Sequence, residues 1–341
     1  MYRLTIIDTS ALVHTAQYSS FFKDKSQYAF PVGGIQYLMR YVTSSLRGND
    51  DVILVFDSKH NKRKEIMQDY KSNRVANKSV LMQLDTLYEE LPYCGIRCYK
   101  EDGYEGDDLI NWAVCQNIGN YNEIQIIGND IDLTHNVQNG VFFKSIVDGV
   151  NDIYTSNFTT SLVKGEKIVF NTISIYKIFN GCHSDNVAPF VSENGYKGPM
   201  LYKTYLQILE MAGCGFTYAL TANKDLFFTI IAQMPCLTEK DREILKQRAN
   251  IIFPLENEKE ISLVGSNMKD VVHTSFNNFL SMYGDFNSCR VMGYTMLQKT
   301  EEMQQHLKEK AYKLKSGEYA VDNNLRVNEA PTASTLLLKE F

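Results

Sequence analysis

Leu4-Thr5-Ile6-Ile7-Asp8 is the stretch that decides the fold, because it is a short apolar, β-branched run that ends on an aspartate. The same pattern recurs at Val52–Asp57 and at Ile124–Asp130. Runs of this kind predict buried strands. Residues 34–46 and 107–115 lie between them and repeat apolar positions with helical spacing. This alternation predicts an α/β fold with a mainly parallel central sheet and helices on both faces.

The pattern changes near residue 171, which indicates a second region. Residues 1–172 hold the predicted strands, whereas residues 173–341 predict a helical domain. The final residues, 328–341, begin polar and finish on an apolar tip, which fits either a mobile tail or a segment docked on the core. Helices are predicted in the second region at residues 173–179, 200–211 and 238–249, and in the charged stretch 295–313.

Composition sets the class of protein. The 341 residues suggest about two domains. No apolar run is long enough to span a membrane, and the N-terminus lacks the apolar stretch of a signal peptide. The seven cysteines are scattered and form no C-x-x-C pair, as expected of reduced thiols. We therefore expect a soluble cytoplasmic protein that does not interact with membranes.

Acidic side chains follow each of the three predicted strands. Because the carboxyl ends of parallel strands meet at one edge of a sheet, these acids are expected to converge there. A further acidic group opens the helix that begins near residue 107. So many carboxylates cannot all stay ionised without cations, and oxygen ligands favour Mg²⁺ or Mn²⁺. Taken singly, each acid also fits a turn or a helix cap. The acids are Asp8, Asp57, Glu105, Asp107, Asp108, Asp130 and Asp132.

A basic segment, residues 59–74, follows the second predicted strand. Its six Lys and Arg residues outweigh Glu65 and Asp69 by 6 − 2 = +4. Cations beside an acidic metal site suit a phosphodiester substrate, although a solvated, salt-bridged helix gives the same pattern. The formal net charge of −5 does not exclude nucleic-acid binding, because two divalent ions would add +4.

These motifs, in this order, resemble the 5′-nuclease superfamily, which comprises flap endonucleases and the 5′ to 3′ exonuclease domains of bacterial polymerases. The resemblance covers residues 1–190 and is strongest to the phage branch, near the primer-removing ribonuclease H of T-even phages. It rests on Asp8, on Asp57 with Tyr-Lys-Ser-Asn-Arg at 70–74, on Tyr-Glu-Gly-Asp-Asp at 104–108, on Asn-Asp-Ile-Asp at 129–132, and on Ser-Asp-Asn at 184–186.

The resemblance implies a PIN-like 5′-nuclease fold, two Mg²⁺ ions, replaceable by Mn²⁺, and hydrolysis by a two-metal mechanism. It places a basic arch at about residues 58–92, from which Lys71 and Arg74 reach the scissile phosphate and Tyr70 stacks on a terminal base. Asp130 and Asp132 complete the implied catalytic set. The implied metal ligands are Asp8, Asp57, Glu105, Asp107, Asp108, Asp130, Asp132 and Asp185. The implied nucleic-acid contacts are Lys59, Lys62, Arg63, Lys64, Tyr70, Lys71, Arg74, Lys197 and Lys203.

The activity that the resemblance implies is a 5′ to 3′ exonuclease and 5′-flap endonuclease. Its expected substrates are RNA primers on DNA and DNA 5′ ends in duplexes during lagging-strand replication. The helical domain is expected to bind the duplex. Expected partners are a single-stranded-DNA-binding protein and a sliding clamp, with the tail 328–341 as a contact. A monomer is expected, in the cytoplasm of the host cell if a phage encodes the chain.

Two departures from the superfamily pattern stand out. The motif Gly-Asp-x-x-Asp-Asn has Cys182 in place of its first aspartate, so weaker binding of the second metal is expected. A softer metal is the other interpretation, but a lone cysteine is usually an inert small hydrophobe. The duplex-binding glycine repeat is reduced to residues 194–199, which suit either a phosphate-binding turn or an ordinary interhelical turn.

Two other functions fit parts of the sequence. A nucleic-acid-binding protein that has lost catalysis is favoured by Cys182 alone. An aspartyl-phosphate phosphatase would explain Asp8, but that chemistry needs a second acid two residues later, where this chain has Ser10. No P-loop or dinucleotide-binding motif is present in the sequence.

Overall fold

The computed structural model describes the chain in ten stretches. These are residues 3–18, 32–48, 50–147, 150–154, 161–163, 166–168, 172–212, 223–256, 265–267 and 269–282. The charged stretch 295–313 and the tail 328–341 lie outside the described residues, so both remain predictions.

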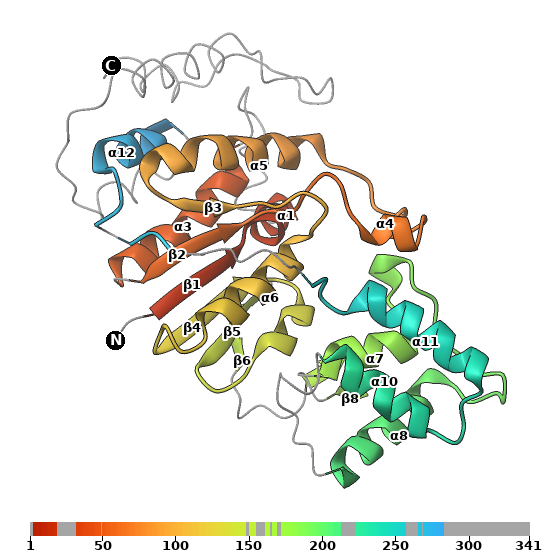
Figure 1. Ribbon diagram of the computed structural model, residues 1–341. Helices are drawn as coiled ribbons and strands as arrows, with labels where there is room; N and C mark the ends of the chain where they lie inside the picture. The colour runs from red at the N-terminus through yellow and green to blue at the C-terminus, as the bar shows by residue number, and fades with distance from the viewer. Residues whose placement is uncertain are drawn as a thin grey trace.

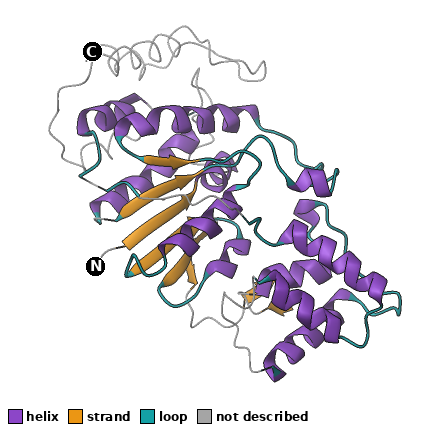
Figure 2. Cartoon of the chain, in the orientation of Figure 1, coloured by secondary structure: helices purple, strands orange, loops and turns teal. Residues whose placement is uncertain are grey.

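A six-stranded sheet forms the centre of the first part of the chain, with the order β3-β2-β1-β4-β5-β6 (Figures 1 and 2). All neighbouring strands are parallel except β5 and β6, which are antiparallel. The three predicted strands are confirmed as β1, β2 and β4. The strands are β1 (Arg3–Asp8), β2 (Asp51–Val55), β3 (Arg97–Tyr99), β4 (Glu123–Gly128), β5 (Val141–Val147) and β6 (Val150–Tyr154), and a separate hairpin pairs β7 (Ser161–Val163) with β8 (Glu166–Ile168).

Helices cover both faces of this sheet, as the alternation of its buried side chains requires. In β2, Val52 and Leu54 enter one apolar core, and Ile53 and Val55 enter the core on the opposite face. Burial on both faces explains why the strands are continuous apolar runs. The helices of this part are α1 (Thr9–Tyr18), α3 (Gly33–Arg47), α4 (Arg63–Ile66), α5 (Lys78–Glu90) and α6 (Gly106–Asn117), with 3₁₀ turns η2 (Leu91–Cys94) and η3 (Ile131–Asn136).

The second part of the chain is helical around its own core, as predicted. Phe179, Tyr205 and Phe227 lie at its centre, with ring centroids 5.4–6.0 Å apart. Thr238 and Asp241 form a capping box at the start of α11, which begins where the helix over residues 238–249 was predicted. The elements are α7 (Ile173–Asn180), the 3₁₀ turn η5 (His183–Asp185), α8 (Gly198–Met211), α10 (Lys224–Gln233) and α11 (Glu239–Ile252).

Residues 265–282 return from the helical part to the sheet (Figure 1). The backbone of Ser266 pairs with Val52 beside β2. The helix α12 (His273–Met282) buries Phe276 and Phe279 in the core between the sheet and α3. The predicted boundary at residue 172 stays a prediction, but the α/β core takes part of its apolar packing from beyond it. Among the described helices, none combines the length and hydropathy needed to cross a membrane.

Candidate metal centre and nucleic-acid cavity

Three of the predicted acids lie at the carboxyl edge of the sheet, and each accepts a hydrogen bond from a backbone amide at the start of a helix or 3₁₀ turn. Asp8 ends β1 and accepts a hydrogen bond of 2.9 Å from a backbone amide in the first turn of α1. Asp57 follows β2 and accepts a hydrogen bond of 2.6 Å from the backbone amide of Gly106. Asp130 follows β4 and accepts a hydrogen bond of 3.0 Å from the backbone amide of Asp132. Because β1 lies between β2 and β4, the sheet brings these acids together at a topological switch point.

The start of α6 adds three more acids, which face different neighbours. Glu105 and Asp108 form a capping box, in which the side chain of Asp108 accepts 3.0 Å from the amide of Glu105. Asp108 also accepts two hydrogen bonds of 2.7 Å from the guanidinium of Arg63 and is 1% exposed. Asp107, between them, forms no ion pair with any residue that the structure describes and lines a cavity at this edge of the sheet. The helix therefore presents one free carboxylate and uses another to hold Arg63.

Two cavities meet at this edge and share Lys71, Glu105, Asp107 and Asp130 as lining residues. The larger one, about 1360 Å³, is also lined by Asp8, Asp57, Lys64 and Arg74. The smaller one is lined by Asp132, Lys177 and Asp185. We call Asp8, Asp57, Asp107 and Asp130 the four-carboxylate cluster, and Asp132, Cys182 and Asp185 the second cluster.

Burial and mutual repulsion raise the pKa values of Asp8, Asp107 and Asp132. Burial, followed by the charges of Asp57 and Asp130, raises the pKa of Asp8 from 3.8 to about 7. Burial and the charges of Asp130 and Asp8 raise the pKa of Asp107 well above its usual value. Burial, then Asp130, raises the pKa of Asp132 to about 7. Negative charge is therefore crowded around Asp8, Asp107 and Asp130.

The four-carboxylate cluster fits a divalent cation by its chemistry. Its donors are all carboxylate oxygens, and none of the four residues forms an ion pair within the described part of the chain. Within the same described residues, no three His, Cys, Asp or Glu side chains already stand in the geometry of a metal site. Binding of an ion would relieve the repulsion among these carboxylates.

The second cluster rests on a tight turn that follows α7. Gly181 has a φ of +77°, and a Cβ there would lie 2.5 Å from the carbonyl oxygen of Val187, so the position needs glycine. Backbone hydrogen bonds of 2.8 and 2.9 Å join Cys182 and Val187 and close the turn. The turn holds Asp185 toward the cavity, while the Sγ of Cys182 lies 3.0 Å from the Oγ of Ser184.

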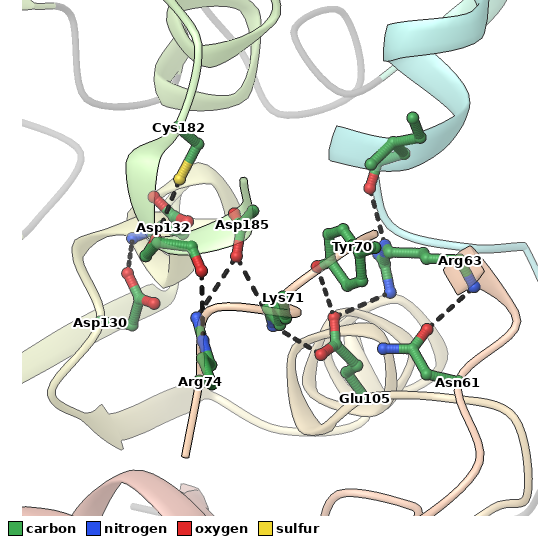
Figure 3. Close-up of polar contacts among 12 residues, drawn as sticks. Asn61, Arg63, Tyr70, Lys71, Arg74, Glu105, Asp130, Asp132, Cys182 and Asp185 are labelled. Atoms are coloured by element: carbon green, nitrogen blue, oxygen red, sulfur yellow. Dashed lines mark hydrogen bonds and ion pairs between the residues drawn. The ribbon is translucent and has the colours of Figure 1, made fainter. Parts of the chain in front are cut away.

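Cations pair directly with the acids of the second cluster (Figure 3), whereas the four-carboxylate cluster forms no ion pair among the described residues. The Nζ of Lys71 lies 2.5 Å from Glu105 and 3.7 Å from Asp185. Arg74 lies 3.3 Å from Asp185, and Lys177 pairs with Asp132. Burial opposes the charge of Lys71, but Glu105 and Asp185 outweigh it and raise its pKa. Burial raises the pKa of the Cys182 thiol, which keeps the thiol neutral.

Two residues of the basic segment predicted to bind nucleic acid are buried instead. Arg63 is 4% exposed and donates to the carbonyl oxygen of Ile251 at 2.7 Å as well as to Asp108. Tyr70 is 4% exposed, and its hydroxyl donates to Glu105 at 2.8 Å (Figure 3). In this structure Arg63 joins α6 to α11, and the ring of Tyr70 is not free to stack on a base. The burial of Arg63 and Tyr70 could not be predicted from the sequence, because a basic segment shows the same pattern whether its side chains are buried or exposed.

The other predicted contacts divide by location. Lys71 and Arg74 lie at the cavity, as do Lys59 and Lys64, whose side chains are exposed. Lys62 is also exposed and donates to the hydroxyl of Tyr104 at 2.8 Å. The exposed side chains of Lys197 and Lys203 line neither cavity, and α8, on which Lys203 lies, is on the side of the helical part away from the sheet (Figure 1).

The glycine-bearing segment before α8 forms an interhelical turn. The backbone amide of Tyr196 donates a hydrogen bond to the Oγ of Ser192 at 3.0 Å. The backbone amide of Ser192 donates in turn to the carbonyl oxygen of Tyr196 at 2.9 Å. The amide of Glu193 donates to Asp241 of α11 at 3.0 Å. These bonds occupy part of the backbone that a phosphate would need, so the interhelical alternative fits better than the phosphate-binding one.

One functional candidate was missed by the sequence reasoning. Lys177 lies on α7, with an apolar residue on either side in the sequence, and its side chain is 16% exposed at the smaller cavity. A single lysine in an apolar helix, five residues before Cys182, was the available signal.

Comparisons with known proteins agree with the fold. Residues 3–165 match the family model described as the 5′-3′ exonuclease, N-terminal resolvase-like domain. A 5′-3′ exonuclease of Buchnera aphidicola subsp. Schizaphis graminum is 28% identical over 170 residues, which are 48% of this chain and 55% of that protein. The chain thus matches only about half the length of this curated relative.

Solved structures with a similar fold include proteins of bacteriophage T5. The T5 D15 protein, co-crystallised with metal ions, has a TM-score of 0.50 and 15% identity, and the match covers 73% of this chain and 88% of that chain. A complex of the T5 D15 flap endonuclease with DNA and metal ions has a TM-score of 0.49 and 16% identity, with the same coverage. The family match, the strand-end acids and the sheet order agree, and residues 3–165 therefore belong to the 5′-nuclease superfamily.

Proposed function

We propose that the protein is a divalent-metal-dependent nuclease that hydrolyses phosphodiester bonds near the 5′ ends of nucleic acids. The observation that carries this proposal is the four-carboxylate cluster, which pairs with no cation in the described part of the chain and opens into a cavity of about 1360 Å³ with Lys64, Lys71 and Arg74 on its wall. Anionic ligands for a metal beside cations for phosphate are what phosphodiester hydrolysis requires.

The four-carboxylate cluster would hold the ion, with Mg²⁺ or Mn²⁺ favoured by its oxygen donors. A bound ion of this kind lowers the pKa of a water molecule and stabilises charge on the reacting phosphate. The T5 D15 protein, which has a similar fold, was crystallised with metal ions. Asp57 and Asp130 are positioned for binding by their hydrogen bonds to the amides of Gly106 and Asp132.

Lys71 and Arg74 would bind the phosphate that is cut. Both line the cavity beside the four-carboxylate cluster, and both are held near it by Asp185. A phosphate group that enters the cavity competes with Asp185 and Glu105 for these cations. Their positive charge then stabilises the transition state, where negative charge accumulates on the phosphoryl oxygens.

The preference for 5′ ends is supported by the match to the 5′-3′ exonuclease domain. We extend the proposal to 5′ flaps and to RNA primers on DNA, removed during lagging-strand replication with a single-stranded-DNA-binding protein and a sliding clamp as partners. This extension is supported by the motif resemblance over residues 1–190.

The test is cleavage of a 5′-labelled RNA–DNA duplex and of a 5′-flap duplex, with titrations of Mg²⁺ and Mn²⁺ and a chelator control. Short 5′ products that disappear with chelator are expected. Asp130→Asn should lose at least 100-fold in rate and keep DNA binding, because it removes a proposed metal ligand and lessens repulsion of phosphate. Asp225→Asn, a matched change at an exposed acid on α10, should cut like the unmodified protein.

The outcomes separate the nuclease from its alternative. Tight binding to flap DNA without cleavage in either metal would contradict the proposal and identify a DNA-binding protein on a nuclease fold. Loss of both binding and cleavage in Asp130→Asn would show that Asp130 supports the structure instead.

A further inference from the structure

The two acidic clusters differ in their cations. The four-carboxylate cluster carries four acids and no ion pair among the described residues. The second cluster carries two acids, Asp132 and Asp185, and these pair with Lys177 and Arg74, so its formal charge is −2 + 2 = 0. Lys71, shared with Glu105, adds further positive charge at 3.7 Å from Asp185. Only the four-carboxylate cluster therefore has unpaired negative charge, among the described residues, for a divalent ion to neutralise.

Lys177 is held in place by the fold. It lies in the last turn of α7, where its carbonyl oxygen accepts 2.8 Å from the amide of Gly181, immediately before the turn that carries Cys182 and Asp185. Its side chain is 16% exposed and that of Asp132 is 20% exposed, so the pair is largely removed from water. The interaction is therefore little screened by solvent.

The donors of the second cluster suit an ammonium group better than a second Mg²⁺. Cys182 contributes a largely buried sulfur, which lies against the Ser184 hydroxyl and is a poor ligand for a hard cation. One oxygen of Asp132 pairs with Lys177, so only its other oxygen, Oδ1, which is buried and has no hydrogen-bond partner among the described residues, is left as a donor. That leaves Asp185 as the second carboxylate, which already pairs with Lys71 and Arg74.

We infer that the Nζ of Lys177 takes the place of a second divalent ion, so that the protein binds one catalytic metal at the four-carboxylate cluster and supplies its second positive centre from its own chain. This inference rests on the proposed function. Lys177 is a positioning residue here, because it fixes Asp132 and the charge of the second cluster. The ammonium carries one positive charge, whereas a divalent ion would carry two. A larger share of the transition-state stabilisation must therefore come from Lys71 and Arg74.

The test counts bound Mn²⁺ on the full chain by electron paramagnetic resonance of the free ion, without nucleic acid and without an activity readout. One Mn²⁺ per chain is expected for the unmodified protein and for Lys177→Arg, which keeps the charge. The double variant Lys177→Met with Cys182→Asp should bind two, because it removes the ammonium and adds a carboxylate. Cys182→Asp alone should still bind one. Lys246→Met, which removes an exposed helical ion pair on α11, is the control and should bind one.

Each outcome decides between the proposals. Two sites in the unmodified protein, differing less than 10-fold in affinity, would overturn the inference and leave the nuclease proposal standing. One site in the folded double variant would also overturn it, with folding checked by circular dichroism. No bound Mn²⁺ at millimolar concentration would overturn the nuclease proposal itself, and the inference with it.

Discussion

Asp107 and Asp108 are neighbours in the chain with opposite surroundings. Asp108 is neutralised by a bidentate pair with Arg63, whereas Asp107 faces Asp8 and Asp130 without a cation of its own. A buried carboxylate that is paired supports the fold, and one that is unpaired costs free energy until a ligand arrives. The same residue type therefore serves stability at one position and metal binding, as we propose, at the next.

The unpaired acids make the metal-free protein less stable as the pH rises. The pKa of Asp8 is raised to about 7 in the folded state, so the folded protein binds more protons than the unfolded chain between about pH 4 and pH 7. Stability therefore falls with rising pH across this window, by at most about 1.4 kcal/mol per pH unit for this group.

Asp8→Asn tests this sign. In chelator, the variant should be more stable than the unmodified protein at pH 8 and by a smaller margin at pH 5, because Asn carries no charge at either pH and the cost of ionising Asp8 grows as the pH rises. The measurement is thermal unfolding at both pH values. An equal difference in melting temperature at pH 5 and pH 8 would show that Asp8 is not protonated in the folded state.

Arg63 is expected to stabilise the fold rather than bind nucleic acid. Arg63→Met leaves Asp108 buried without its partner and should lower the free energy of unfolding by about 3–5 kcal/mol. Lys64→Met, a matched change at the exposed neighbouring residue, should change it by less than about 0.5 kcal/mol. Urea unfolding measures both. A stable Arg63→Met protein with weakened DNA binding would reverse this assignment.

At the scale of the element, the basic segment is docked on the turn that follows α7. Arg74 and Asn73 donate to the carbonyl oxygens of Ser184 and His183 at 3.2 and 3.0 Å. From the turn, the side-chain amide of Asn186 donates hydrogen bonds to Asp69 and Ser72 at 3.1–3.4 Å. The segment that carries Lys71 is thus held by exposed hydrogen bonds, which exchange readily with water.

Asn186→Gly should loosen this docking. Asn186 has a φ of +62°, which glycine adopts without strain, so the change removes the side-chain amide and keeps the turn. Trypsin should then cut after Lys71 and Arg74 several-fold faster than in the unmodified protein. Asn194→Gly is the control. It removes a hydrogen bond from the interhelical turn before α8 to the carbonyl oxygen of Cys236 and should leave the rate of cutting unchanged. An unaltered rate in Asn186→Gly would mean that the ion pairs alone hold the segment.

At the scale of the whole molecule, the chain crosses between its two parts more than once. The basic segment reaches from the sheet to α11 through Arg63, and residues 265–282 return from the helical part to pack on the sheet. Val271 and Phe276 are buried in the same core as α3 and β2. The smaller cavity is lined by residues of both parts, Asp107 and Asp130 from the first and Lys177 and Asp185 from the second, so its geometry depends on both parts of the chain.

Phe276→Ala tests this dependence. The side chain is fully buried, so its removal leaves a cavity and should cost about 3–5 kcal/mol of unfolding free energy. Met211→Ala, at a side chain that is 87% exposed, should cost less than about 0.5 kcal/mol. Denaturant unfolding provides the comparison. If the two variants were equally stable, α12 would not contribute to the core.

The order of strands and acids was readable from the sequence because it depends on local patterns. Leu4–Asp8 shows a buried strand and the acid that follows it within a few residues, and the parallel arrangement then places Asp57 and Asp130 at the same edge. The capping box of α11 was predictable for the same reason, since Thr238 and Asp241 are three residues apart.

Which acids are already paired was decided by tertiary packing. The sequence by itself determined the α/β fold, the edge at which the acids gather and the position of the basic segment, because hydrophobic periodicity and strand ends are local. Only the tertiary structure decided that Arg63 pairs with Asp108 and Lys177 with Asp132, each across 45 residues. The physical reason is that the environment of a charge is set by whatever packs around it, and distant parts of the chain supply those neighbours.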